Sequence, residues 1–116
     1  MFFAEYAIPM TDQRPSQINE RIAAIKAELA QIGQMRPGSL TRQYKDPQRH
    51  TGAYYQLSYT RDMKSRTEYV PRDRLNEARR QIRTYKRFRS LIEERVKLSI
   101  EQCRLLIRSA RSSSGG

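Results

Sequence analysis

The stretch from Arg72 to Ala110 contains neither proline nor glycine, the two residues that most often end a helix. Apolar residues recur along it with a seven-residue period, which is typical of a long helix packed on another helix. The members of this repeat are Leu75, Ala78, Ile82, Tyr85, Ile92, Val96, Cys103 and Leu106. Arg89 and Ser99 interrupt it, so the pattern predicts either one helix or two that meet near Arg89 and Ser90. Part of such a long helix must pack on another helix or on a second copy of the chain.

A second apolar stripe lies near the start of the chain. Its members recur at spacings of four, three, four and three, and they are Ile18, Ile22, Ile25, Leu29 and Ile32. Ser16 is a candidate N-cap and Gly33 a candidate C-cap, so we expect a helix over residues 16–33. Residues 1–15 contain two prolines and no sustained periodicity, which predicts an extended arm. At the other end, the Ser/Gly-rich residues 111–116 predict a flexible tail.

Residues 38–70 have the alternation of polar and apolar side chains that is typical of strands. The clearest strand is expected over residues 53–60, with Tyr55 and Leu57 on one face and Tyr54 and Gln56 on the other. Further strands are expected over residues 39–44 and 65–70. Met63 is unfavourable in a tight two-residue turn, so a looser loop over residues 61–64 is expected. Together these elements predict a single α+β domain over residues 16–110, with an N-terminal helix, a three-stranded antiparallel sheet and a long basic C-terminal helix, and helical self-association.

The charge of the chain indicates an anionic partner. Lys and Arg number 23 against 12 Asp and Glu, and the formal net charge is +11. Such an imbalance destabilises a compact state by self-repulsion, so it usually reflects binding to an anionic partner. The excess is densest between Arg72 and Arg89, where Asp73 and Glu77 are the only acids. Bases at helical spacing there could neutralise successive phosphates, and the candidates are Arg79, Arg80, Arg83, Lys86, Arg87 and Arg89. The alternative is a solvated helix face.

The sheet offers a second candidate surface. Its polar face is expected to present Tyr54, Gln56, Ser58 and Arg66, with Arg61 and Lys64 at the hairpin tip and Arg42 on the first strand. Sheets read DNA by laying a face in a groove, and RNA by stacking bases on exposed aromatic rings. The alternative is that Tyr54 only covers a neighbouring strand.

Signatures of catalysis are lacking in the sequence. His50 is the one histidine, and no cysteine or carboxylate stands near it at a metal-ligand spacing. Cys103 lies within the apolar repeat and is expected to be a buried core residue. We therefore expect no enzyme activity, no metal and no cofactor. The single cysteine, the absence of a secretory signal pattern and the absence of a membrane-spanning run predict a cytoplasmic protein that does not bind membranes.

Four short strings resemble a poorly characterised group of small basic prokaryotic proteins that are often encoded near transposases or other mobile elements. The strings are Met35–Leu40 (MRPGSL), Gly52–Thr60 (GAYYQLSYT), Tyr69–Pro71 (YVP) and Tyr85–Arg89 (YKRFR). The resemblance spans residues 35–98 and implies a role beside a mobile element. Members of the group often have a cysteine-rich stretch where this chain has Lys45–His50, and a glycine where it has Met63. The architecture is also similar to the arm-binding domains of tyrosine recombinases.

These observations favour a DNA-binding accessory factor of a mobile element, with a transposase as a possible protein partner. Two alternatives remain open at this point. One is an RNA-binding component of a ribonucleoprotein. The other is an oligomeric assembly or adaptor protein whose helices bind an acidic protein partner.

Overall fold

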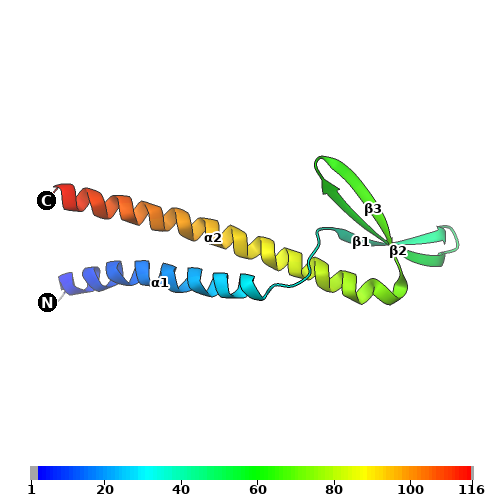
Figure 1. Cartoon of the computed structure of the whole chain (residues 1–116), viewed down its shortest axis with the longest axis horizontal. Helices are drawn as coiled ribbons and strands as arrows, with labels where there is room; N and C mark the ends of the chain where they lie inside the picture. Colours follow the sequence, from blue (N-terminus) through cyan, green and yellow to red (C-terminus); the bar gives the residue numbers. More distant parts are fainter. Residues whose placement is uncertain (1–2, 116) are drawn as a thin grey trace. The chain divides into compact units, whose positions relative to one another are not determined.

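The computed structural model describes residues 3–115, and the side chains of residues 13–111. The elements in chain order are α1 (Phe3–Gln31), β1 (Ser39–Asp46), β2 (Thr51–Arg61), β3 (Lys64–Val70), a 3-10 turn (Arg72–Arg74) and α2 (Leu75–Gly115) (Figure 1). This arrangement confirms the predicted α+β fold. The long C-terminal helix is one continuous segment, which settles the choice between one helix and two. No helix in the described part of the chain has an apolar stretch long enough to cross a membrane.

The chain forms two compact units, where the sequence predicted a single domain. The helical unit consists of the residues up to Gln31 and those from Arg89 onward, and the sheet unit consists of Ile32–Phe88. Helix α2 contributes its first part to the sheet unit and its second part to the helical unit. The physical reason is length, because a three-stranded sheet covers only a few turns of a helix of 41 residues.

In the helical unit, α1 and the second part of α2 run antiparallel. Its fully or nearly buried side chains are Ile18, Ile22, Ile25 and Leu91. Two ion pairs flank this core: the guanidinium of Arg21 donates two hydrogen bonds to Glu94, at 2.6 and 2.7 Å, and that of Arg14 does the same to Glu101. The bond from Arg14 lowers the pKa of Glu101, and both arginines have a raised pKa for the reciprocal reason. Both pairs bridge the two helices across their antiparallel contact.

Several predicted boundaries are wrong for the helical unit. Helix α1 begins at Phe3, so the described part of the predicted extended arm is helical, and Ser16 lies inside the helix rather than at its cap. A proline inside a helix removes one backbone hydrogen bond and need not end it. The helix ends at Gln31, two residues before Gly33. Helix α2 continues to Gly115 through the predicted flexible tail, because extending an existing helix requires no new nucleus.

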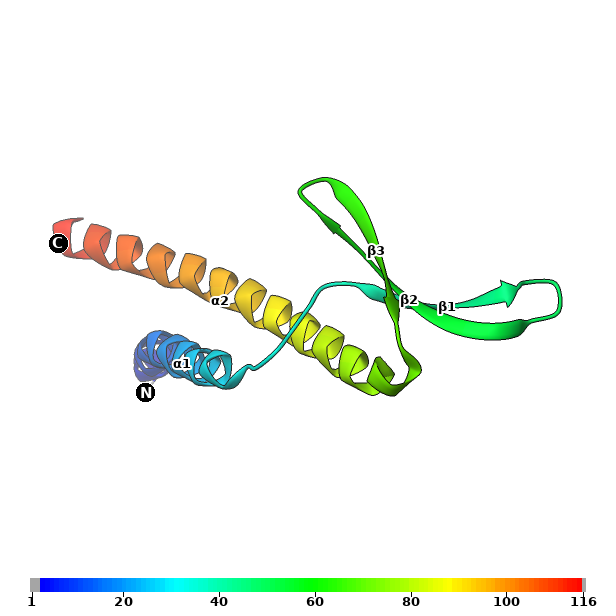
Figure 2. The ribbon, with the colours of Figure 1, turned by 45° about the vertical axis from the view of Figure 1, so that its right-hand side comes forward.

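In the sheet unit, the strands are antiparallel in the order β1-β2-β3. Leu57 at the centre of β2 is fully buried and pairs with Leu40 on β1 and Glu68 on β3. Helix α2 covers this face through a core that consists of Leu57, Val70, Leu75, Ala78 and Ile82, with Leu40, Tyr55 and Tyr59 packed around it. The opposite face of the sheet has no part in this core. Figure 2 shows the two hairpins pointing in different directions, as the twist of a sheet requires.

The turn between β2 and β3 is tighter than predicted. Arg61 pairs with Lys64, which leaves a two-residue turn at Asp62 and Met63 with φ of 53° and 63°. Both angles fall in the left-handed region that a type I′ turn demands, and this turn matches the twist of a hairpin. Aspartate tolerates that conformation, whereas Met63 adopts it at a cost. The geometry of the hairpin therefore prevails over the preference of the residue.

The segment that enters β1 is fixed to both the sheet and α2. The amide N–H of Arg36 donates to the carbonyl of Gln81, and its guanidinium binds Glu68 and lies 5.9 Å from the centre of the Tyr59 ring. Gly38 has φ of 139°, and a Cβ there would lie 3.0 Å from the side chain of buried Leu57. Only glycine combines that angle with so close an approach.

Candidate nucleic-acid interface

Basic side chains of α2 gather along one flank of the helix within the sheet unit. At about 3.6 residues per turn, Arg79, Arg83 and Lys86 fall to one side of the core positions Ala78 and Ile82. All three are exposed. The flank therefore presents three positive charges over two turns of helix, and they point outward beside the start of β1.

This flank forms one wall of a shallow groove. The other lining residues come from Gly38–Leu40 and from the core residue Ile82, and no acidic side chain lines the groove. Arg83 and Lys86 have no ion-pair partner among the described residues. Unpaired guanidinium and ammonium groups in a groove without acids attract an anion such as a phosphate.

The strands extend this positive surface. The guanidinium of Arg79 lies 5.8 Å from the centre of the Tyr55 ring, and Arg42 on β1 is the strand partner of Tyr55. Arg42 in turn lies 5.6 Å from the ring of Tyr44, which stacks on His50 at 4.9 Å. Aromatic faces hold guanidinium groups in place by cation–π attraction without consuming their hydrogen-bond donors. Arg42 and Arg79 are therefore positioned but still able to bind an anion.

The opposite flank of α2 has a different chemistry. Glu77 accepts a hydrogen bond from Arg74 at 3.1 Å, and Gln81 donates to Gln34 at 3.3 Å. Arg36 is bound to Glu68 on the same side. Polar groups there are engaged with one another. Among the described residues of this part of α2, bases without an ion-pair partner are Arg79, Arg83 and Lys86 on the flank beside β1 and Arg80 on the outer side of the helix.

The face of the sheet opposite α2 is polar and nearly uncharged. Residues paired across antiparallel strands share a face, so the register places Thr41 and Tyr69 beside Gln56, and Gln43 beside Tyr54. Side chains on this face carry hydroxyl or amide groups, except for Lys45. Its members are Ser39, Thr41, Gln43, Lys45, Tyr54, Gln56, Ser58, Thr60, Ser65, Thr67 and Tyr69. Tyr69 is 67% exposed.

Such a surface can donate and accept many hydrogen bonds without attracting ions strongly. Hydroxyl and amide side chains of this kind contact base edges, sugars and phosphate oxygens in protein–DNA complexes. The sheet unit thus has two surfaces with complementary chemistry: the positive groove between α2 and the start of the edge strand β1, and the hydrogen-bonding face, which share Ser39.

Comparison with known proteins places the chain in a family. The model of a domain of unknown function, DUF6788, matches residues 15–80, which is more than half of the chain. The chain belongs to this family. The match spans the second part of α1, the whole sheet and the start of α2, so Arg79 and Arg80 lie within the DUF6788 match while Arg83 and Lys86 follow it. Neither the curated proteins nor the solved structures contain a match to the chain.

Only some of the residues predicted to bind nucleic acid come together in this DUF6788 protein. Arg79, Arg83 and Lys86 line the groove, and Arg42 is the strand partner of Tyr55, whose ring lies beside Arg79. Arg80 and Arg87 lie on the side of α2 turned away from Ala78, and Arg89 belongs to the helical unit.

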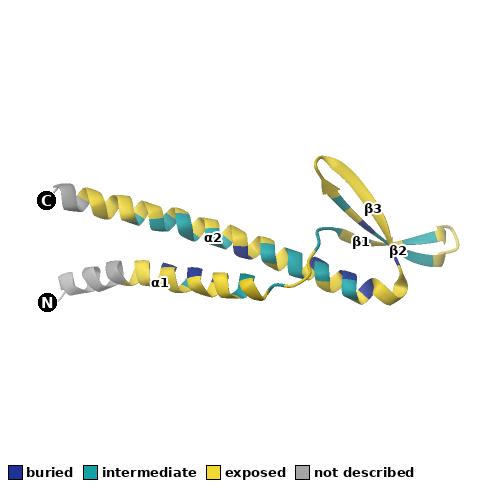
Figure 3. Cartoon of the chain, in the orientation of Figure 1, coloured by how far each residue is buried: buried dark blue, intermediate teal, exposed yellow. Residues whose placement is uncertain are grey.

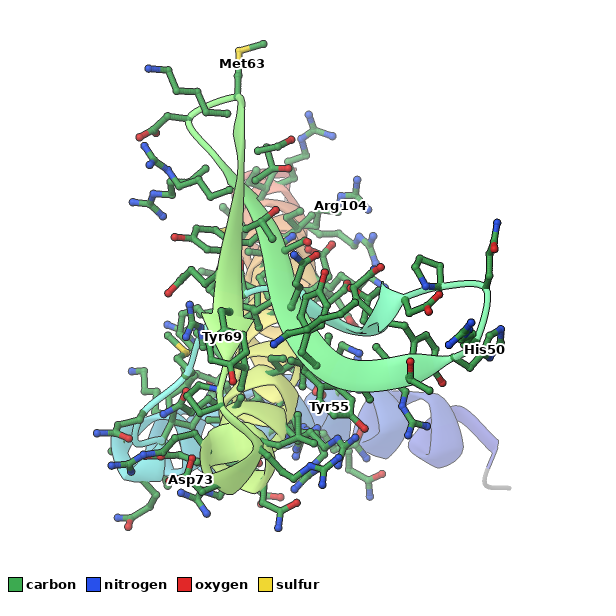
Figure 4. The ribbon with its side chains drawn as sticks, turned by 90° about the vertical axis from the view of Figure 1, so that its right-hand side faces the viewer. His50, Tyr55, Met63, Tyr69, Asp73 and Arg104 are labelled. Atoms are coloured by element: carbon green, nitrogen blue, oxygen red, sulfur yellow. The ribbon has the colours of Figure 1, made fainter. Side chains whose placement is uncertain are left out.

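Arg61 and Lys64 lie at the tip of the β2–β3 hairpin, as predicted, but Arg66 was assigned to the wrong face of the sheet. Arg66 pairs with Tyr59, so it shares the face of Leu57 and not that of Tyr54 and Gln56. Pairing Thr60 with Ser65 across the turn would have revealed this from sequence. Arg61 and Lys64 share the face of Arg66. Arg61 lies about 20 Å along β2 from Tyr55 and about 13 Å from Leu57, the strand partner of Leu40 in the groove. Figure 4 shows Met63 and His50 at two separate hairpin tips.

The sequence interpretation missed Tyr69, Thr41, Gln43 and Lys45, which stand on the hydrogen-bonding face. Alternation alone assigns faces within a strand, and these residues could be found only through the register between strands. No group of three or more metal-ligating side chains occurs among the residues that the structure describes.

Proposed function

We propose that this DUF6788 protein binds nucleic acid through its sheet unit, favours duplex DNA over RNA, and acts in the cytoplasm by binding rather than by catalysis. The observation that carries this proposal is the segregation of charge along α2. Arg79, Arg83 and Lys86 share one flank in a groove without acids, while Glu77, the one acid of α2 within the sheet unit, lies on the other flank and is bound to Arg74. A solvated helix face would have no reason to separate the charges in this way.

Phosphate binding by the groove would provide most of the affinity. Each base that neutralises a phosphate releases condensed counterions, so affinity falls steeply with salt. Arginine side chains such as those of Arg42, Arg79 and Arg83 also suit phosphate, because their planar donors bind two oxygens at once. Such contacts would orient the protein on the polymer without reading its sequence.

The hydrogen-bonding face supports duplex DNA as the preferred polymer. Its three strands span about 10 Å between the outer axes, which fits the B-DNA major groove of about 12 Å. The major groove of an RNA duplex is too deep and narrow for side chains to read. Proteins that bind single strands rely on stacking against the bases. This face has two aromatic residues, Tyr54 and Tyr69, and its nine other members cannot stack.

The resemblance to proteins encoded beside mobile elements supports a more specific role. A small protein that binds duplex DNA without cutting it would serve a transposase as an accessory factor. It would position the DNA, and the transposase would carry out the chemistry. This role rests on the resemblance alone, whereas DNA binding rests on the two surfaces.

The proposal is tested by fluorescence anisotropy titrations of a labelled duplex, the matching single strand and an RNA duplex, each at several salt concentrations. We expect the DNA duplex to bind most tightly, with affinity that falls steeply as salt rises. Replacing Gln56 and Tyr69 together by alanine should weaken duplex binding and leave the salt slope unchanged, because those contacts are uncharged. Tyr69→Phe is the control that keeps the ring. Absence of binding at low salt, or equal affinity for all three polymers, would contradict the proposal.

A further inference from the structure

The second part of α2 exposes an apolar stripe on the side that faces away from α1. Glu94 and Glu101 point to α1, and Leu91, Leu98 and Leu105 lie on that same side of the helix. A second set of apolar residues lies about half a turn away, and none of them is buried (Figure 3). Its members are Ile92, Val96, Ile100, Cys103 and Ile107.

The stripe is too large to be incidental. Val96 is 47%, Ile100 48% and Ile107 57% exposed, and the three line one hollow with the small residues Ser99 and Cys103. Cys103 is itself exposed, so its predicted place in the core is wrong: the seven-residue repeat had merged the two sides of the helix. Contiguous apolar surface of this kind marks an interaction site.

The charges around the stripe are basic. Glu94 and Glu101 are bound to Arg21 and Arg14 of α1, which removes them from the outer surface. The charged residues that border the stripe are Arg95, Lys97, Arg104 and Arg108, with Glu93 as the single acid. Arg95 and Arg104 line the hollow itself. A partner that covers the apolar residues must therefore also meet a positive border.

A second copy of the chain does not satisfy this condition. A second copy brings the same border of four bases and one acid to the contact, so like charges predominate at its edges whichever way the two helices run, which is unfavourable.

A lipid surface fits poorly for another reason. Helices that lie on membranes usually insert aromatic side chains, and the stripe has none. Its small residues Ser99 and Cys103 instead leave a hollow between larger neighbours, Val96, Ile100 and Ile107. This is the shape that accepts the side chains of a facing helix.

We propose that this stripe docks an amphipathic helix of a protein partner whose apolar face is bordered by acidic residues. Val96, Ile100, Cys103 and Ile107 would receive the apolar side chains, and Arg95 and Arg104 would pair with the flanking carboxylates. The site belongs to the helical unit, so the inference stands apart from nucleic-acid binding by the sheet unit. The chain would thereby connect a nucleic acid to a second protein.

The test uses the full chain and two synthetic helical peptides. Both peptides carry leucine at the core positions of a heptad repeat, and they differ only at the flanking positions, where one has glutamate and the other lysine. We expect the glutamate peptide to bind about tenfold or more tightly than the lysine peptide, and replacing Val96 and Ile100 by serine to weaken it by a similar factor. Met63→Ser, which alters a residue that is 98% exposed in the sheet unit, is the matched control and should have no effect.

Three results would overturn the proposal. The first is equal binding of the two peptides, or binding that the serine variant does not weaken. The second is a dimer in light scattering that oxidation traps through Cys103, which would assign the stripe to a second copy. The third is binding to anionic vesicles in place of the peptide. The Arg83→Gln/Lys86→Gln variant tests whether the peptide binds to positive charge in the sheet unit. It should lose DNA affinity but keep its affinity for the glutamate peptide, whereas the Val96/Ile100 serine variant should lose peptide affinity but keep its DNA affinity.

Discussion

Replacing Arg83 and Lys86 together by glutamine isolates the phosphate contact on which the proposed function depends. Both side chains are exposed, line the groove and have no ion-pair partner among the described residues, so their loss should leave the fold intact. Each phosphate contact contributes about 0.9 to the slope of log K against log salt on duplex DNA. Two contacts should therefore reduce the slope by about 1.8, and at 0.1 M salt the affinity should fall by about 60-fold.

The assay is an anisotropy titration of a labelled duplex at four or more salt concentrations. The matched control is Lys26→Gln with Arg111→Gln, which removes the same charge from exposed positions of the helical unit. That variant should lose little affinity and keep the wild-type slope. If the control and the groove variant behave alike, net charge and not the groove causes binding. If neither changes the slope, the phosphate contact has been placed wrongly.

Three further predictions concern the fold. Met63→Gly should stabilise the sheet unit by about 0.5 to 1 kcal/mol in thermal or urea unfolding, because glycine has no Cβ and adopts the left-handed conformation without strain. This gain already includes the greater chain entropy that glycine loses on folding. Met63→Ala keeps the Cβ and should give no gain. Gly38→Ala should destabilise it by roughly 1–3 kcal/mol, since the new Cβ meets Leu57 and the backbone angle is unfavourable; an unchanged midpoint would contradict this. Because Arg14 lowers the pKa of Glu101, the stability from this pair is present above the ordinary value of 4.5 and is lost as the pH falls through the lowered pKa. The difference in melting temperature between wild type and Glu101→Gln should accordingly shrink in acid, and parallel pH profiles would exclude the effect.

Regular elements with a strong local signal were predictable from the sequence. The alternation around Leu57 located the central strand, and the absence of proline and glycine after Pro71 located α2. The strings that resemble a known group prove to be residues of the sheet unit, except for Arg89: Gly38 packs against Leu57, and Val70 belongs to the core. In these places local preference and tertiary packing agree.

The remaining errors arise where tertiary contacts override local preference. Alternation within a strand could not place Arg66 or Tyr69, whose faces depend on pairing with β2. Met63 opposed a tight turn, yet the twist of the hairpin imposed one. The repeat that included Cys103 combined two sides of α2, because seven residues make nearly two full turns and either side satisfies the period. The side that faces α1 is the one that carries the fully buried Leu91 and the ion-paired Glu94 and Glu101.

The most direct test of the account is a map of backbone amide shifts by NMR, recorded on the ¹⁵N-labelled full chain as duplex DNA is added at low salt. We expect the shifts to concentrate in the sheet unit, with the largest at Thr41, Gln56, Tyr69 and Arg83. The residues of the helical unit from Arg14 to Gln31 and from Leu91 to Arg108 should change little. Shifts confined to the helical unit, or none at any DNA concentration, would contradict the claim that the sheet unit binds nucleic acid.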